Sequence, residues 1–180
     1  ELRSHNRSEE KKSRFVSEIQ IARDNSAIIP GIIPVIDYSI DDYWYTMPIA
    51  QPVMDFINEK TLDEIIDGVL LLCETLGRLH DKGIHHRDIK PSNIYYYDGR
   101  FAFGDFGLVD FPDNDDFTKS DRGLGAIFTI APEMKRNPKL ADASKADVFS
   151  LAKTLWMFLS GDEKGFDGVY NYLDQSHSLR

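Results

Sequence analysis

Cysteine is nearly absent from this chain of 180 residues, since Cys73 is the only one and no internal disulfide can form. Long apolar runs are also missing, because the most apolar stretch, residues 146–160, is interrupted by Asp147 and Lys153. A transmembrane helix needs ~18 or more apolar residues, so no membrane span is predicted. No signal peptide is visible. These absences are typical of a reducing compartment, and we expect a cytoplasmic protein.

Positive charge is scarce relative to negative charge. The chain has 21 lysine and arginine residues against 30 aspartate and glutamate residues, which gives a formal net charge of −9. It contains no block of basic residues, so binding to nucleic acid is not expected. Apolar residues make up 42% and aromatic residues 12% of the chain, which is enough for a folded core. The chain begins at Glu1 rather than at methionine, and we expect the parent protein to continue upstream.

The first fifty residues predict one helix and one hairpin. Apolar residues recur at helical spacing over residues 8–24 and predict a helix there, with Glu18 on its flank. Two β-prone runs, residues 35–40 and 43–49, are separated by a pair of aspartates and predict a β-hairpin.

Two local signals organise the middle of the chain. Residues 61–64, Thr-Leu-Asp-Glu, have the spacing of a capping box and predict the start of a long helix. Further along, Asp98-Gly99 separates β-prone runs at residues 94–97 and 100–103. Asp-Gly between two such runs is a strong signal for a tight hairpin.

The last part of the chain combines a long loop with a hydrophobic helix. Residues 104–132 show little periodicity and are predicted to be a loop, which at that length is usually functional. Residues 144–160 are apolar on nearly every side, which predicts a helix in the middle of the domain. Ser144 and Asp147 have the spacing of a capping box at its start.

Three oxygen-bearing side chains are placed to meet in one cleft. Asp88 and Asn93 lie between the long helix and the second hairpin, and Asp105 follows that hairpin. Because the two ends of a hairpin lie close together, we expect these three to converge. A carboxylate and an amide oxygen suit a hard divalent cation such as Mg²⁺, and a second carboxylate suits the orientation of an attacking hydroxyl. Lys90 supplies positive charge for a phosphoryl group.

Three short motifs follow one another: His-Arg-Asp-Ile-Lys-Pro-Ser-Asn at residues 86–93, Asp-Phe-Gly at 105–107 and Ala-Pro-Glu at 131–133. In this order and spacing they resemble the catalytic domain of eukaryotic-type (Hanks-type) protein kinases, of the serine/threonine class. The resemblance implies a two-lobed α+β fold. Most of it would be the helical C-lobe, residues 51–180, with a partial N-lobe at residues 1–50.

The resemblance also implies a reaction, the transfer of the γ-phosphoryl group of Mg-ATP to a serine or threonine hydroxyl of a protein. Asp88 would be the catalytic aspartate, and Lys90 would contact the γ-phosphate and act in catalysis. Asn93 and Asp105 would bind Mg²⁺. The implied ligands are therefore ATP, Mg²⁺ and a protein substrate, and autophosphorylation is a further implied reaction.

Several residues match the family's nucleotide site. Glu18 matches the partner of the nucleotide-binding lysine, and Met47 matches the gatekeeper. Pro48, Ile49 and Ala50 match the hinge strand whose backbone contacts adenine.

Other residues match structural and regulatory positions. Arg87 resembles the arginine that pairs with a phosphorylated activation loop, for which Thr118 and Ser120 are the candidate acceptors. Asp147 matches an acid that holds the backbone of the catalytic loop. Glu133 matches a glutamate that pairs with an arginine.

The chain departs from the family's pattern at three points. No glycine-rich loop or lysine fits before Glu18, and Ala126 follows Gly125 where a threonine is usual. The chain also stops before the helices that complete the C-lobe, so we expect Glu133 to be buried without its arginine, at a high cost. We therefore expect the isolated chain to be inactive and marginally stable.

Two alternatives from other functional classes stay open. Small-molecule phosphotransferases of the aminoglycoside or choline type share a His-x-Asp-x-x-x-x-Asn loop, but they generally lack Lys90 and the Asp-Phe-Gly and Ala-Pro-Glu motifs. A catalytically inactive kinase-like scaffold generally loses Asp88, Asn93 or Asp105, and all three are present here.

Overall fold

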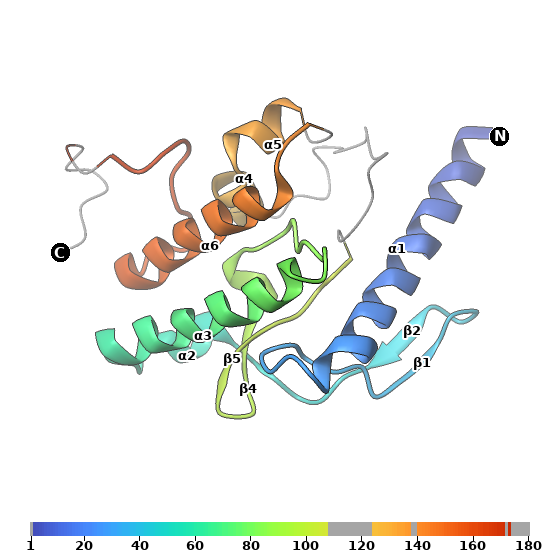
Figure 1. Ribbon diagram of the computed structural model, residues 1–180, viewed down its shortest axis with the longest axis horizontal. Coiled ribbons are helices and arrows are strands. Elements are labelled where there is room, and N and C mark those ends of the chain that lie inside the picture. The colour runs from blue at the N-terminus through green and yellow to red at the C-terminus, as the bar shows by residue number, and fades with distance from the viewer. Residues whose placement is uncertain (1, 108–123, 138–139, 172, 174–180) are drawn as a thin grey trace.

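The computed structural model describes residues 2–107, 124–137, 140–171 and 173 (Figure 1). The elements in chain order are α1 (Leu2–Ser26), β1 (Asp37–Ser39), β2 (Trp44–Thr46), β3 (Gln51–Pro52), α2 (Val53–Ile57), α3 (Leu62–His80), the 3-10 turn η1 (Pro91–Asn93), β4 (Ile94–Tyr97), β5 (Arg100–Phe103), α4 (Leu124–Thr129), α5 (Pro132–Arg136) and α6 (Ala143–Ser160). None of the helices in the described ranges is long and apolar enough to cross a bilayer.

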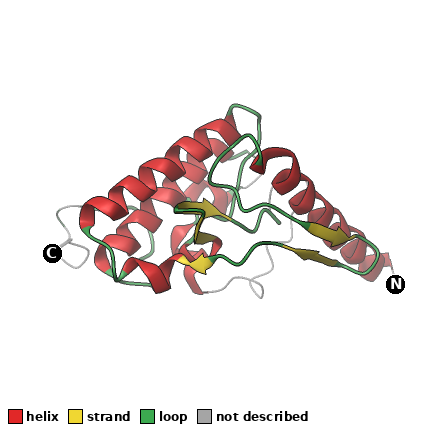
Figure 2. Cartoon of the chain, turned by 90° about the horizontal axis from the view of Figure 1, so that it is seen from below, coloured by secondary structure: helices red, strands yellow, loops and turns green. Residues whose placement is uncertain are grey.

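Helices and two small antiparallel sheets confirm the predicted α+β class. Strands β1 and β2 form a two-stranded sheet beside α1, and β3, β4 and β5 form a three-stranded sheet (Figure 2). The Asp-Gly hairpin is confirmed, because Asp98 and Gly99 both have positive φ angles, 51° and 76°. Its register pairs Ile94 with Phe103, so the residues just before β4 and just after β5 leave the sheet side by side.

The main core lies where α3 packs against β5 and α6. Its centre is formed by buried side chains from these three elements, including Leu72, Leu76, Leu79, Phe101, Phe103 and Phe158. The predicted capping box is confirmed, since the Thr61 hydroxyl accepts a hydrogen bond from the Glu64 amide and the Glu64 carboxylate accepts one from the Thr61 amide. The long helix therefore begins where the sequence indicated and presents its apolar face to the sheet.

The N-terminal elements differ in length from the prediction. Helix α1 begins at Leu2 rather than near residue 8, because the polar opening contains no proline or glycine to stop it. The hairpin is present, but β1 and β2 have three residues each, fewer than the predicted runs. Ile36 and Met47, at the ends of those runs, are exposed and lie outside the paired strands.

Two expectations about the C-terminal part were wrong. The segment predicted as a loop over residues 104–132 contains the short helix α4. Helix α6 is capped by Asp142, whose carboxylate accepts a hydrogen bond from the Lys145 amide, so Ser144 is inside the helix and forms no capping box with Asp147. The buried carboxylate of Asp147 instead accepts hydrogen bonds from the backbone amides of His86 and Arg87.

A buried lysine ties the segment that follows α6 to that helix. The ammonium of Lys153, which is 4% exposed, donates hydrogen bonds to the carbonyl oxygens of Phe166 at 2.7 Å and Gly168 at 2.9 Å. It also lies 3.1 Å from the centre of the Phe166 ring. Burial lowers the pKa of Lys153 to about 8, although Asp167 acts in the opposite direction.

The lowered pKa of Lys153 predicts a pH dependence of stability. Unfolded lysine titrates near 10.5, so the folded state binds fewer protons between about pH 8 and 10.5, and the free energy of unfolding rises across that window. Relative to Lys153→Met, the wild type should gain on the order of 1–3 kcal/mol between these pH values in urea denaturation. Lys145→Met is the control, because Asp142 raises the pKa of this exposed lysine above 10.5, so Lys145 contributes no comparable rise within this window. Parallel pH curves for wild type and Lys153→Met would contradict the assignment.

The contact between α3 and β5 predicts opposite effects for two glycines of the same helix. A Cβ at Gly68 would lie 2.5 Å from the Phe101 ring, whereas a Cβ at Gly77 would meet nothing within 4 Å. We expect Gly68→Ala to destabilise the fold by about 1–3 kcal/mol through overpacking. Gly77→Ala should stabilise it by about 0.5–1 kcal/mol through helix propensity. Thermal denaturation of both variants checks this, and equal shifts would show that the contact is loose.

Candidate active site

The segment between α3 and β4 fixes the Asp88 carboxylate from two sides. Lys90 donates to Asp88 Oδ2 at 2.7 Å, and the side-chain amide of Asn93 donates to the same oxygen at 2.9 Å. The Asn93 amide also donates to the Asp88 carbonyl at 2.9 Å. The structure thus brings together three of the predicted site residues. The side-chain oxygen of Asn93 accepts a hydrogen bond from the Ser92 hydroxyl at 3.4 Å.

Asp105 reaches the same region from the other end of the hairpin. The amide of Gly104 donates to the Asn93 carbonyl at 3.0 Å, so the residue before Asp105 is bonded directly to the catalytic-loop segment. Asp105 is exposed and has a φ of 58°. Such a left-handed conformation costs roughly 1–2 kcal/mol outside glycine. Its carboxylate accepts a hydrogen bond from the Gly107 amide at 3.3 Å, which holds the turn locally.

The carboxylate of Asp147 holds the backbone before Asp88. It is fully buried and accepts hydrogen bonds from the backbone amides of His86 at 2.8 Å and Arg87 at 2.7 Å. His80 Nε2 lies 3.0 Å from the same carboxylate. Arg87 has a φ of 62°, and these bonds offset the cost of that left-handed turn. The geometry agrees with the role that the resemblance implied for Asp147.

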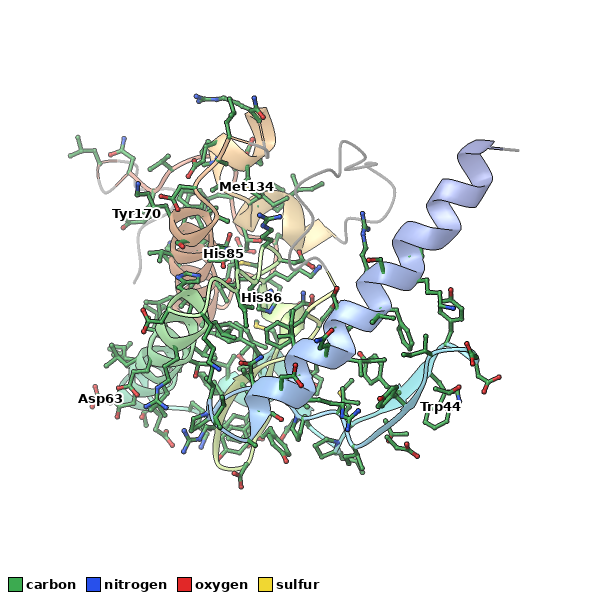
Figure 3. The ribbon with its side chains drawn as sticks, turned by 45° about the vertical axis from the view of Figure 1, so that its right-hand side comes forward. Trp44, Asp63, His85, His86, Met134 and Tyr170 are labelled. Carbon is green, nitrogen blue, oxygen red and sulfur yellow. The ribbon has the colours of Figure 1, made fainter. Side chains whose placement is uncertain are left out.

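His86 anchors this loop in the core. The side chain is completely buried, and its ring packs against Phe103 at a centroid distance of 5.2 Å and Phe106 at 4.9 Å (Figure 3). Within the described ranges its ring nitrogens make no hydrogen bond. His85, by contrast, lies 3.0 Å from the Ser144 hydroxyl. Packing of His86 therefore links the loop to the last residue of β5 and to the residue after Asp105.

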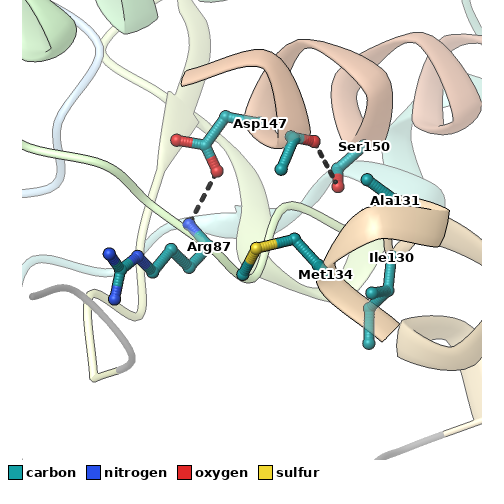
Figure 4. Close-up of a pocket in the computed structure, with 7 residues that line it drawn as sticks. Arg87, Ile130, Ala131, Met134, Asp147 and Ser150 are labelled. Atoms are coloured by element: carbon teal, nitrogen blue, oxygen red, sulfur yellow. Dashed lines mark hydrogen bonds between the residues drawn. The ribbon is translucent and has the colours of Figure 1, made fainter. Parts of the chain in front are cut away.

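A small pocket joins the first and third motifs (Figure 4). Its wall on one side is Arg87 with Asp147, and Ala131 of the Ala-Pro-Glu motif lies on the other. The remaining lining residues are Ile130, Met134, Ala146 and Ser150. The Ala-Pro-Glu motif is therefore adjacent to the segment 86–93, although 37 residues separate the two in the chain.

The expectation for Glu133 was wrong. The sequence predicted a buried carboxylate without a partner, but Glu133 is exposed. Pro132 starts helix α5 immediately after the buried Ala131, and the first turn of that helix directs Glu133 to solvent while Met134 is buried. The cost of an unpaired buried carboxylate does not arise here. Thr118 and Ser120 lie outside the described residues.

Glu18 has a partner that the sequence did not indicate. The Tyr45 hydroxyl donates to Glu18 Oε1 at 2.7 Å. Burial raises the pKa of Glu18, the Tyr45 hydrogen bond lowers it, and the nearby charge of Asp105 raises it. Glu18 is therefore close enough to Asp105 for their charges to interact. Spacing along the chain gave no signal for this contact, because it joins α1 to a strand 27 residues further on.

The predicted hinge residues connect the two sheets. Met47, Pro48, Ile49 and Ala50 lie between β2 and β3, after the last paired residue of the first sheet. Met47 is 42% exposed and Ile49 is fully exposed, while Pro48 and Ala50 are partly buried. The structure places this segment in the connection between the two sheets.

Comparison with known families fits this geometry. A family model described as protein kinase domain matches residues 1–172. This match covers nearly all of the chain, and the chain belongs to the protein kinase family.

Curated relatives carry kinase names. The chain is 33% identical over 104 residues to a Wee1-like protein kinase of Oryza sativa, a match that covers 56% of this chain and 18% of the relative. It is 34% identical over 145 residues to a serine/threonine-protein kinase of Acanthamoeba polyphaga mimivirus, covering 73% and 52%. It is 29% identical over 168 residues to the serine/threonine-protein kinase PrkC of Bacillus subtilis, covering 86% and 24%. The chain thus spans about half or less of the length of these relatives.

The two backbone hydrogen bonds to Asp147 predict that its isosteric replacement by asparagine strongly lowers the free energy of unfolding. In Asp147→Asn one oxygen becomes an amide donor that faces a backbone amide, so one buried N–H loses its partner. We expect a loss of about 2–3 kcal/mol in the free energy of unfolding, measured by urea denaturation. Asp142→Asn is the matched control on the same helix, because asparagine is an equally good N-cap. A loss in Asp147→Asn no larger than in the control would contradict the proposed support of the loop.

Proposed function

We propose that this chain is the catalytic part of a protein serine/threonine kinase, which transfers the γ-phosphoryl group of Mg-ATP to a protein hydroxyl. The observation that carries the proposal is the fixed Asp88 carboxylate, held by Lys90 and Asn93 beside the Asp105 segment. Family membership and the names of the relatives support the same reaction class. Phosphoryl transfer depends mainly on positioning and electrostatics, and this arrangement supplies both.

Each side chain has a defined task in this proposal. Asp88 orients the substrate hydroxyl and accepts its hydrogen bond, while Lys90 balances the negative charge of the transferring group. Asn93 and Asp105 offer a carbonyl oxygen and a carboxylate, the oxygen ligands that Mg²⁺ prefers. The bound ion would neutralise charge on the phosphates. The Asn93 amide nitrogen is hydrogen-bonded to Asp88, so the side-chain oxygen is the atom of Asn93 that would bind the ion.

The nucleotide site is proposed to combine both parts of the chain. Glu18 and the connection at residues 47–50 come from the partial N-lobe, residues 1–50, and the phosphate-binding residues come from residues 51–180. Hydrogen bonds cross the boundary: the amide of Phe103 donates to the Gly31 carbonyl at 2.8 Å, and that of Ile33 to the Phe103 carbonyl at 3.0 Å. The Thr75 hydroxyl also donates to the Pro30 carbonyl at 2.8 Å. These contacts support a fixed placement of the two parts next to the hairpin that carries Asp105.

The partners and location follow from the same proposal. The substrate would be a protein with a serine or threonine, and autophosphorylation at Thr118 or Ser120 is a further proposed reaction. Mg-ATP is the proposed donor. A cytoplasmic location stays a prediction, supported by the single cysteine, Cys73, which is free and exposed.

Asp105→Asn in the protein that carries this chain tests the proposal. Asparagine tolerates the positive φ of residue 105, so the backbone should be unchanged while the metal-binding carboxylate is lost. We expect transfer of radiolabelled phosphate to a generic protein substrate to fall by at least about 100-fold. Asp98→Asn is the control, because Asp98 is also in the left-handed region but lies at the exposed tip of the hairpin. Full activity of Asp105→Asn would refute the proposed function.

A further inference from the structure

The Glu18 carboxylate depends on one neutral donor. Among the described residues, Glu18 forms no ion pair, and its only hydrogen bond comes from the Tyr45 hydroxyl. The helix that carries Glu18 contacts the β1–β2 hairpin at two other points. The Lys12 ammonium lies 3.9 Å from the Asp41 carboxylate, and the Arg23 side chain donates to the Tyr38 hydroxyl at 2.7 Å. Of these ties, only the Tyr45 bond ends on a side chain of the proposed nucleotide site.

Packing against Phe15 places the Tyr45 hydroxyl beside the Glu18 carboxylate. Phe15 lies three residues before Glu18, on the same face of α1. Its ring is 5.5 Å from the ring of Tyr43 and 5.8 Å from that of Tyr45. The hydroxyl of Tyr45 therefore meets the carboxylate one turn along the helix, whereas the half-exposed Tyr43 makes only the ring contact.

The second oxygen of Glu18 faces the Asp-Phe-Gly segment. A Cβ built on Gly107 would lie 3.5 Å from Glu18 Oε2 and 3.3 Å from Asp105 Oδ1. The two carboxylates therefore border the same space beside Gly107. Like charges at such a position repel, and without a donor on Oε1 the Glu18 side chain would turn away or take up a proton. Burial raises the pKa of Tyr45, as do Glu18 and Asp105, so the hydroxyl keeps its proton and remains a donor.

We propose that Tyr45 is a positioning residue of the phosphotransfer site: its hydroxyl holds Glu18 Oε1 so that Oε2 is presented beside Asp105. The inference rests on the proposed function for its effect on turnover, but the hydrogen bond itself is independent of that function. Tyr45 acts through Glu18 and touches neither substrate nor metal. In this way a neutral side chain orients a carboxylate in a part of the site where negative charge already accumulates.

Tyr45→Phe and Tyr43→Phe form a matched pair, because both keep the ring against Phe15 and only the first removes a donor from Glu18. In the protein that carries this chain, we expect Tyr45→Phe to lower kcat/KM for Mg-ATP by about tenfold, the effect of one charge-assisted hydrogen bond. Tyr43→Phe should change it by less than about twofold. In a Glu18→Ala background, which removes the acceptor, Tyr45→Phe should have no further effect, because the residue acts only through Glu18.

A spectroscopic readout separates the hydrogen bond from the activity. With carboxyl-¹³C glutamate, the Glu18 resonance at constant pH should move in Tyr45→Phe and stay in place in Tyr43→Phe. If Tyr45→Phe does not fold, the ζ-carbon resonance of Tyr45 in Glu18→Ala tests the same bond from the other side. Equal kinetics of the two tyrosine variants, an unmoved Glu18 resonance, or an undiminished effect of Tyr45→Phe in the Glu18→Ala background would overturn the inference. Absence of phosphotransfer in the unmodified protein would instead overturn the proposed function, and the resonances would still decide whether Tyr45 holds Glu18.

Discussion

The buried carboxylate of Asp147 is the constraint on which the site geometry depends. It accepts hydrogen bonds from two backbone amides of the loop before Asp88. In that loop Arg87 has an unfavourable left-handed conformation. Asp88 is the next residue in the chain, so its position follows from that turn. A buried carboxylate is costly without partners, and the loop supplies them, which means that helix α6 and the loop stabilise each other.

The β4–β5 hairpin fixes the position of Asp105 relative to the loop that carries Asp88. Its register pairs Ile94 with Phe103. Asn93, just before Ile94, and Asp105, two residues after Phe103, therefore lie at the same end of the hairpin. A slip of one residue would turn Phe103 away from the core and separate the two ends. Burial of Phe103 and of Phe106, which both contact His86, opposes such a slip. The hydrophobic core therefore sets the spacing of the polar site.

Local signals in the sequence were sufficient to predict the elements that position the site. They were insufficient to predict features that depend on tertiary contacts. The capping box at Thr61 and the turn at Asp98 depend on neighbours within a few residues, and both were predicted. The exposure of Glu133 depends on how α5 meets α6, and the hydrogen bond from Tyr45 joins residues 27 positions apart. Neither follows from spacing along the chain. The contact between Asn93 and Gly104, the residue before Asp105, was predictable because a hairpin brings its two ends together whatever its surroundings.

The distribution of charge explains why these residues suit a cationic ligand. Asp88 is paired with Lys90, and its charge is balanced within the loop. In the described part of the chain, Asp105 and Glu18 have no cationic partner, and each raises the pKa of Tyr45 and of Tyr95 nearby. The donors that hold these two carboxylates, a backbone amide and a phenol, are neutral and leave the negative charge in place. Among the described residues, these two carboxylates therefore concentrate negative charge beside Gly107, and a divalent cation that carries phosphate would relieve it.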